Sequence, residues 1–215
     1  MYIGRFVIVG KTPAGEWYLG YRVSSRSFPN RRIVVQEDRA VVLPTPEAPP
    51  SDNPYISYNC LRQHGPVAIA ANGSHVDPAI DKVGLGYPLR DALALAMLAM
   101  DYEHDRLDTP RIAAAVDLAG DAGYLAIVAK EQLSVQRVPV LAGEALLIAT
   151  YERTTPTPIR LAGSRAEDLA EAIFQSEYEH PVAALAALLG DGGRRAAAAT
   201  VGGRSQEAVN NADTR

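Results

Sequence analysis

The chain has 215 residues, of which 47% are hydrophobic and 21% charged, and its net charge is −4. This length fits one domain, and the mild acidity argues against a nucleic-acid binder that works by neutralising phosphates. A single cysteine, Cys60, excludes an internal disulfide and a cysteine metal cluster. The first residues lack the pattern of a signal peptide and no stretch is apolar enough to cross a bilayer, so we expect a cytoplasmic protein.

Six short apolar or β-branched runs occupy the first third of the chain and predict strands. A proline-rich stretch, 44–54, predicts a surface excursion between the fourth and fifth of them. The predicted strands are residues 3–10, 17–23, 33–35, 40–43, 55–60 and 67–71.

The rest of the chain mixes helical and extended patterns. Residues 88–100 are rich in Ala, Leu and Met and predict a helix. A second helix is predicted over 165–175, with Ser164 as its N-cap, and 181–189 could form a third. Residues after Gly190 show no apolar period and predict a frayed tail. Four more strands are predicted at 112–118, 124–129, 133–141 and 145–151.

Two groups of strands, each associated with helices, predict an α+β fold in which two sheets pack together with helices outside. Most connections are too short for a helical crossover, so we expect antiparallel sheets. The chain shows no internal repeat and no linker. We therefore expect one catalytic domain over 1–190 and a flexible C-terminal tail over 191–215.

The stretch 22–31, at the end of the second predicted strand and in the loop after it, gathers cations. Arg22, Arg26 and Arg31 lie among hydroxyl and amide side chains, including Ser24 and Asn30. A planar guanidinium donates two parallel hydrogen bonds to a phosphate or carboxylate, so the loop predicts an anion site. The alternative is a solvated loop whose arginines pair with nearby acids.

The apolar stripe of the first predicted helix, extended by one step, reaches the carboxylate of Glu103. Burial would penalise the charged form of the carboxylate and so raise its pKa, which would suit it to proton transfer near neutrality. The alternatives are a frayed helix end that turns Glu103 to water, or a pair with an arginine. A metal site is a weaker alternative. The stripe runs through Leu89, Leu93, Ala96 and Met100, and the metal site would use Asp101, His104 and Asp105.

Two more polar groups follow predicted strands. Tyr58 ends a strand, where a tyrosine can donate a hydrogen bond or simply pack. Cys60 would be a nucleophile only with a base beside it, and His64 is the nearest candidate in sequence. The turn 72–75 could contact a ligand or be an ordinary polar turn. No phosphate-loop or dinucleotide fingerprint occurs.

Four separated motifs and a shorter one carry a family resemblance. They are YIGRF at 2–6, YRVSSRSFPNR at 21–31, NPYISYNC at 53–60, NGSH at 72–75 and DYE at 101–103. In this order they resemble the archaeal-type IMP cyclohydrolase family, over most of the chain up to about residue 175.

The resemblance implies ring closure of 5-formamidoimidazole-4-carboxamide ribonucleotide (FAICAR) to inosine monophosphate (IMP) with loss of water, the last step of purine synthesis. It also implies a four-layer α-β-β-α sandwich like that of the N-terminal-nucleophile hydrolases. Because Tyr2 follows Met1, removal of the initiator would release no nucleophile. We expect no metal and no redox cofactor, a nucleotide substrate as small-molecule partner, and contact with neither nucleic acid nor membrane.

The resemblance also implies roles for particular residues. We expect the arginines to hold the 5′-phosphate and polarise oxygen, and a tyrosine and a glutamate to transfer protons. The expected catalytic residues are Tyr58, Glu103 and Arg31. The expected substrate-binding residues are Arg22, Ser24, Arg26, Asn30, Asn59, Asn72 and Ser74.

Two other functions stay open at the level of sequence. One is an amidohydrolase with Cys60 as its nucleophile. The other is a non-catalytic purine-nucleotide-binding protein that has kept the fold and the anion loop. A homo-oligomer is compatible with each of them.

Overall fold

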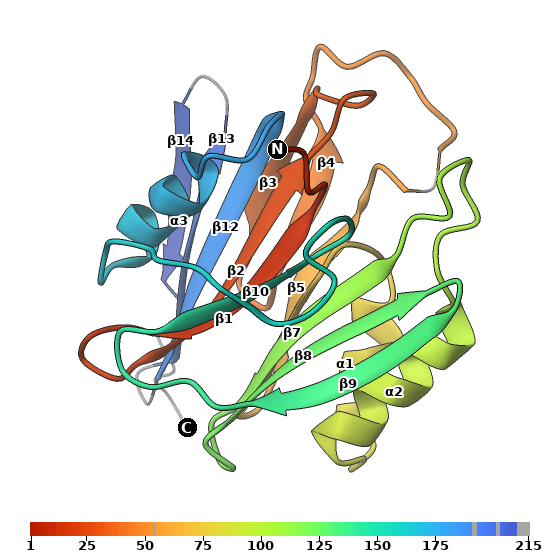
Figure 1. Ribbon diagram of the computed structural model, residues 1–215. Helices are drawn as coiled ribbons and strands as arrows, with labels where there is room; N and C mark the ends of the chain where they lie inside the picture. The colour runs from red at the N-terminus through yellow and green to blue at the C-terminus, as the bar shows by residue number, and fades with distance from the viewer. Residues whose placement is uncertain (54, 191–192, 201–202, 210–215) are drawn as a thin grey trace.

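The computed structural model describes residues 1–53, 55–190, 193–200 and 203–209 (Figure 1). Within these ranges the chain forms two seven-stranded sheets and three helices. Neighbouring strands pair antiparallel in both sheets. The predicted α+β class with two antiparallel sheets is confirmed, and none of the helices in the described ranges is long and apolar enough to span a membrane.

Strands from both ends of the chain form the first sheet. They are β1 (Phe6–Lys11), β2 (Trp17–Ser24), β10 (Ala145–Ala149), β11 (Thr157–Pro158), β12 (Pro181–Gly190), β13 (Gly193–Thr200) and β14 (Gly203–Val209). Their order is β11-β10-β1-β2-β12-β13-β14. The N-terminal hairpin of β1 and β2 therefore lies beside the late strand β12 (Figure 1).

The second sheet follows the chain order without a crossover, β3-β4-β5-β6-β7-β8-β9. Its strands are β3 (Arg31–Val35), β4 (Arg39–Pro44), β5 (Tyr58–His64), β6 (Val67–Ala71), β7 (Arg111–Asp117), β8 (Ala122–Ala129) and β9 (Gln132–Val138). Each predicted strand of the first 151 residues is present, with shifted ends, and the described residues between Pro44 and Tyr58 form the predicted excursion.

The helices pack on the outer faces of the sheets. They are α1 (Val76–Gly84), α2 (Leu89–Met100) and α3 (Ala166–Phe174). One apolar cluster, with Leu19 and Leu61, fills the space between the sheets. A second, with Ile173, lies between the first sheet and α3. A third, with Met97, lies between the second sheet and the α1–α2 pair. Figure 1 shows α3 beside the first sheet and α1 and α2 beside the second.

The predicted third helix is wrong, because residues 181–190 form strand β12. Leu185 and Ala187 face the core between the sheets, whereas Ala184 and Leu188 face α3. A strand that is buried on both faces does not alternate between apolar and polar residues. Only its Ala- and Leu-rich composition is left as a signal, and that composition is typical of a helix. Tertiary burial overrides that propensity.

The predicted frayed tail is corrected over two stretches, where β13 and β14 extend the first sheet beyond β12. Residues 191–192, 201–202 and 210–215 lie outside the described residues. The core contribution of β13 comes from alanines such as Ala196 and Ala198, which are buried between the sheets. Alanines carry little hydrophobic signal, so the pattern looked structureless.

Two helical details also differ from prediction. The sequence did not predict α1, a helix of nine residues with Pro78 in its first turn. In α3, Arg165 rather than Ser164 takes the N-cap position, and no side chain caps the helix there.

At one end of the sandwich, the starts of β1, β5 and β7 meet the end of β6 and the turn after α2.

Candidate active site

Glu103 lies at this end of the sandwich, with 2% of its surface exposed. Helix α2 ends at Met100, and Asp101 takes a left-handed conformation with φ 54°, so Glu103 is not on the helix. A single β-bridge holds its backbone, because its N–H donates to the carbonyl of Thr109 at 2.8 Å. The predicted burial of Glu103 is correct, but the turn after α2 causes it.

Arg5 binds both carboxylate oxygens of Glu103. Its Nη1 donates to Oε1 at 3.1 Å and its Nη2 donates to Oε2 at 2.7 Å. The same Nη1 donates to the carbonyl of Asn72 at 3.1 Å. Burial opposes the charge of Arg5, but Glu103, together with the weaker influences of Tyr58 and Tyr21, outweighs burial, so the pKa of Arg5 lies well above its ordinary value. The result is a largely buried, bidentate ion pair that joins the residue just before β1 to the turn after α2.

Two tyrosines lie next to this ion pair, inside the core between the sheets. The hydroxyls of Tyr21 and Tyr58 are 2.6 Å apart, so one donates to the other. The charge of Arg5 interacts with both rings and with Glu103. Burial, and then the neighbouring Tyr58, raise the pKa of Tyr21 well above its ordinary value, so that phenol stays protonated. The structure thus brings Tyr58 and Glu103 together through Arg5.

The turn 72–75 is fastened to the start of β7. The Asn72 side chain donates to the carbonyl of Pro110 at 2.9 Å and accepts from the N–H of Ile112 at 2.8 Å. The Nε2 of His75 is 3.0 Å from the Ile112 carbonyl, so it is the protonated nitrogen. The side chain of Asn72 therefore connects the turn 72–75 to the start of β7. Ser74 is exposed, next to the polar cluster of Arg5, Tyr58, Glu103 and Arg111, which we call the Glu103 cluster.

His75 should make the protein acid-sensitive. Burial, reinforced by Arg111, lowers the pKa of His75 from 6.5 to about 3. Between these values the unfolded chain binds a proton that the folded chain does not, so stability falls as the pH falls from 6.5. The loss approaches about 1.4 kcal/mol per pH unit.

Urea denaturation from about pH 7 to about pH 5 measures this slope. The control is His75→Gln, whose amide can still donate to the Ile112 carbonyl but does not titrate. The variant should show a flatter dependence on pH; equal slopes in the two proteins would contradict this role of His75.

Two residues of the cluster, Arg5 and Arg111, were not assigned from sequence. Arg5 belongs to the first motif of the family resemblance, which was the available signal. Arg111 opens β7 and is 5% exposed, and its local sequence gave no indication. Its Nε donates to the carbonyl of Asp101 at 2.8 Å.

The metal alternative gains no support from the geometry. Asp105 is engaged in its own turn, where it accepts hydrogen bonds from the N–H and the hydroxyl of Thr109 at 3.0 and 2.8 Å. His104 lies 3.3 Å from Asp101 at the surface. Among the described residues, no group of three or more His, Cys, Asp or Glu side chains is arranged to hold a metal ion.

The three arginines of the predicted anion loop go to different places. Arg22 points to the α3 side of the first sheet, because it alternates with Tyr21 along β2. Its guanidinium donates to the carbonyls of Ser176, at 2.9 Å, and of Tyr178, just beyond α3. The structure therefore gives Arg22 a role at the C-terminal end of α3, away from Glu103.

Arg26 and Arg31 differ in burial. Arg26 is exposed, stacks 4.2 Å over the ring of Tyr2 and lies 3.8 Å from Glu179. Arg31 is only 6% exposed, and its Nε donates to the carbonyl of Phe28 at 3.0 Å. No carboxylate of the described chain lies within ion-pair distance of Arg31.

The remaining predicted ligands are dispersed. Ser24 is buried on the Arg22 side, and its hydroxyl has no partner among the described residues. Asn30 is exposed. Asn59 faces α1, where it donates to Asp77 at 2.8 Å. These three residues are not brought to the Glu103 cluster.

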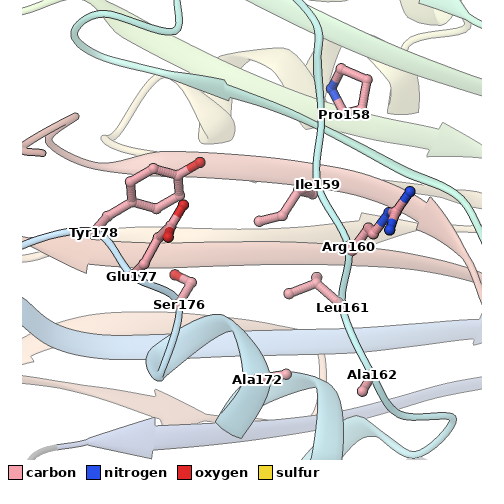
Figure 2. A pocket seen from close by; sticks show the side chains of 9 residues that line it. All are labelled: Pro158, Ile159, Arg160, Leu161, Ala162, Ala172, Ser176, Glu177 and Tyr178. Atoms are coloured by element: carbon pink, nitrogen blue, oxygen red, sulfur yellow. The ribbon is translucent and has the colours of Figure 1, made fainter.

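A separate hollow of about 410 Å³ lies on the outer side of the first sheet, between the end of α3 and the segment after β11. Figure 2 shows Ile159 and Leu161 pointing into it from one side, with Tyr178 opposite. Tyr178 is also a partner of Arg22. Glu103 does not line this hollow.

Cys60 does not have the surroundings of a nucleophile. Its side chain is fully buried, and its thiol donates to the carbonyl of Ala40 at 3.4 Å. Burial raises the pKa of the thiol far above its ordinary range, whereas catalytic cysteines have lowered pKa values. His64, the predicted base, lies on the surface at the other end of β5.

Cys60→Ala should therefore retain nearly all activity, with at most a small loss of stability from the cavity left in the core. Steady-state kinetics of the variant, with thermal melting as the folding control, measure this. Loss of turnover in a folded Cys60→Ala protein would restore the amidohydrolase alternative.

Comparison with known proteins decides the family. The sequence profile of the family described as "IMP cyclohydrolase-like protein" matches residues 2–193. The chain belongs to this family. The resemblance inferred from the motifs is confirmed, and the family match extends beyond residue 175 into β13.

Relatives named IMP cyclohydrolase align with most of the chain. The protein of Methanocella arvoryzae is 48% identical over 188 residues, covering 87% of this chain and 92% of its own. That of Haloquadratum walsbyi is 46% identical over 187 residues, covering 86% and 90%. That of Methanococcus maripaludis is 45% identical over 197 residues, covering 89% and 97%. The IMP cyclohydrolase-like match includes every residue of the Glu103 cluster.

Proposed function

We propose that this chain is an IMP cyclohydrolase, which closes FAICAR to IMP with loss of water. The observation that carries the proposal is the 45–48% identity to relatives named IMP cyclohydrolase over nearly their whole length. The buried polar cluster of Arg5, Tyr58, Glu103 and Arg111 supplies chemistry that fits this reaction. The two-sheet core with outer helices is compatible with the architecture of the N-terminal-nucleophile hydrolases, to which we assign the fold as part of this proposal.

The reaction needs proton transfer and orientation. The carboxamide nitrogen attacks the formyl carbon, a C–N bond forms, and the carbonyl π electrons move to oxygen. One proton leaves the carboxamide nitrogen and another leaves the formamido nitrogen, while the formyl oxygen departs as water and a C=N bond forms. Because an amide nitrogen is a poor nucleophile, the enzyme must hold the two groups in contact and move protons between them. The ring closure itself needs no redox step.

We assign proton transfer to Glu103 and Tyr58. Glu103 is held by Arg5 as a carboxylate with fixed orientation, so it can accept the proton of the carboxamide nitrogen. Tyr58, whose hydroxyl is fixed by Tyr21, can donate toward the leaving oxygen. Ser74, exposed beside the cluster, keeps its proposed contact with the nucleotide.

We assign the 5′-phosphate to Arg31. Ile33 lies two residues after Arg31 on β3 and therefore on the same face of the sheet. Ile33 pairs with Val42, and Val42 pairs with Tyr58, so Arg31 and Tyr58 lie two strands apart on one face of the second sheet. Two strand spacings are about 10 Å and the offset of two residues along the strand is about 7 Å, so the backbones of Arg31 and Tyr58 are about 12 Å apart, which suits a nucleotide whose base lies at Tyr58. Arg31 is also a buried guanidinium without a carboxylate partner in the described ranges.

Comparison of two arginine variants tests this assignment. Arg31→Met should raise KM for FAICAR by about 10- to 100-fold, because charge-assisted hydrogen bonds contribute about 1.5–3 kcal/mol. Arg22→Met should lower the melting temperature, because it removes contacts beyond α3, and leave KM near the wild-type value. Steady-state kinetics and thermal melting measure both. A raised KM in Arg22→Met with an unchanged KM in Arg31→Met would instead assign the phosphate to Arg22.

A time course of IMP formation from FAICAR, with purified protein and chelator, tests the function itself. Turnover supports the cyclohydrolase. IMP binding without turnover would support the alternative of a non-catalytic nucleotide-binding protein. The cytoplasmic location and a homo-oligomeric state stay predictions.

A further inference from the structure

Arg111 holds a buried donor without an acceptor. Its Nη1 lies 3.9 Å from Oε1 of Glu103, which is beyond hydrogen-bond distance. Within the described part of the chain, this nitrogen has no hydrogen-bond partner. Most buried N–H groups are paired. Unpaired nitrogens also occur on Arg22, Arg62 and Arg194, but the one on Arg111 lies beside the carboxylate of Glu103, where it can donate to an oxygen atom of the substrate.

The cluster carries a surplus positive charge. Arg5 and Arg111 contribute two cations and Glu103 one anion, and Arg5 already occupies both oxygens of Glu103. Burial lowers the pKa of Arg111, with Glu103 acting in the opposite direction. The nearby His75 is neutral and presents an unpaired Nδ1. Arg111 forms only a long ion pair with Glu103 and is also influenced by the charge of Asp101, so its Nη1 keeps the capacity to donate a hydrogen bond to a negatively charged oxygen.

Gly73 sets the position of the Arg111 guanidinium. A methyl group on Gly73 would lie 2.7 Å from Nη1 of Arg111, 3.4 Å from Nδ1 of His75 and 3.6 Å from Oε1 of Glu103. The first distance is too short for two unbonded atoms, so any other residue at 73 must displace the guanidinium. Because Gly73 has no side chain, Arg111, His75 and Glu103 can approach one another here. The guanidinium of Arg111 is also held by the hydrogen bond from its Nε to the carbonyl of Asp101.

We propose that Arg111 is a catalytic residue, which binds the formyl oxygen of the substrate and stabilises the negative charge that develops there. The inference rests on the proposed function. When the carboxamide nitrogen attacks, the electron pair of the C=O bond moves to oxygen, and the N–H groups of Arg111 donate to it. Glu103 accepts the proton of the nitrogen at the same end of the site. A fixed donor at such an oxygen contributes about 10²–10³-fold to kcat.

Arg111→Lys and Gly73→Ala test this role in different ways. Lysine keeps the charge but loses the planar donor, and alanine keeps Arg111 but moves it. Both variants should bind IMP within about threefold of wild type and lose about 10²–10³-fold in kcat. Arg62→Gln is the matched control, because Arg62 belongs to the same sheet, pairs with Asp77 at 2.7 Å and lies outside the cluster. It should keep wild-type kcat.

A third variant separates chemistry from structure. In Arg111→Ala, guanidinium chloride below denaturing concentration should restore turnover in a saturable manner, which a purely structural arginine would not show. The inference is overturned if kcat in Arg111→Lys stays within about threefold of wild type. It is also overturned if kcat and IMP affinity fall together without rescue. Failure of the proposed function itself would appear differently, as a wild-type protein that does not turn over FAICAR.

Discussion

Glu103→Gln should lower kcat for ring closure by about 10²–10⁴-fold, the usual contribution of a positioned acid–base group. The affinity for IMP should stay within a few-fold of wild type, because the substitution keeps the size of the side chain. The reason is that glutamine cannot accept the proton that the carboxamide nitrogen must lose. Single-turnover kinetics with FAICAR, together with calorimetric titration of IMP, separate the two quantities.

The matched control for this experiment is Glu131→Gln, an exposed glutamate at the β8–β9 turn, which should not change kcat. Circular dichroism confirms that the Glu103 variant is folded. An equal loss of turnover and IMP affinity would mean that Glu103 only shapes the site. No loss of turnover would assign proton transfer to another group.

Arg5→Met should destabilise the protein by about 3–5 kcal/mol, the cost of leaving one partner of a buried ion pair alone. Glu103 is 2% exposed, and Arg5 donates hydrogen bonds to both of its oxygens. The carboxylate would keep its burial and lose these two donors. Turnover should also fall, because Glu103 would lose its orientation. Denaturant unfolding of the variant measures the free energy of unfolding.

The double variant Arg5→Met with Glu103→Leu sharpens this test. Replacing a whole buried ion pair with apolar groups is often close to neutral, so the double variant should recover stability without recovering activity. Lys130→Met, which breaks the exposed pair with Asp108, is the control and should change stability little. If Arg5→Met behaved like that control, the ion pair would not be an essential part of the fold.

Local patterns predicted the sheets well, because strand periodicity and turn residues are short-range signals. They failed where burial was complete or composition was poor in large side chains. Strand β12 is apolar on both faces and β13 packs through alanines, so neither shows the alternation of a strand with one solvated face. Pro78 similarly obscured the short helix α1.

The residues of the candidate site could be anticipated only in part, and their catalytic roles stay predictions. The family motifs named Tyr58 and Glu103, which the structure places around Arg5. The Arg5–Glu103 pair joins residues 98 positions apart, and no local pattern can show such a contact. For Arg22 the sequence did hold a signal, because adjacent strand residues point to opposite faces. With Tyr21 facing the core, Arg22 had to face α3.

A crystal structure of the complex with IMP tests the central claim, that the end of the sandwich around Glu103 is the site of ring closure. The account predicts that the purine ring lies beside Glu103, with C2, the former formyl carbon, facing Arg111, and with the phosphate on Arg31. IMP bound in the hollow beside Ile159 and Tyr178, with the Glu103 cluster untouched, would contradict it.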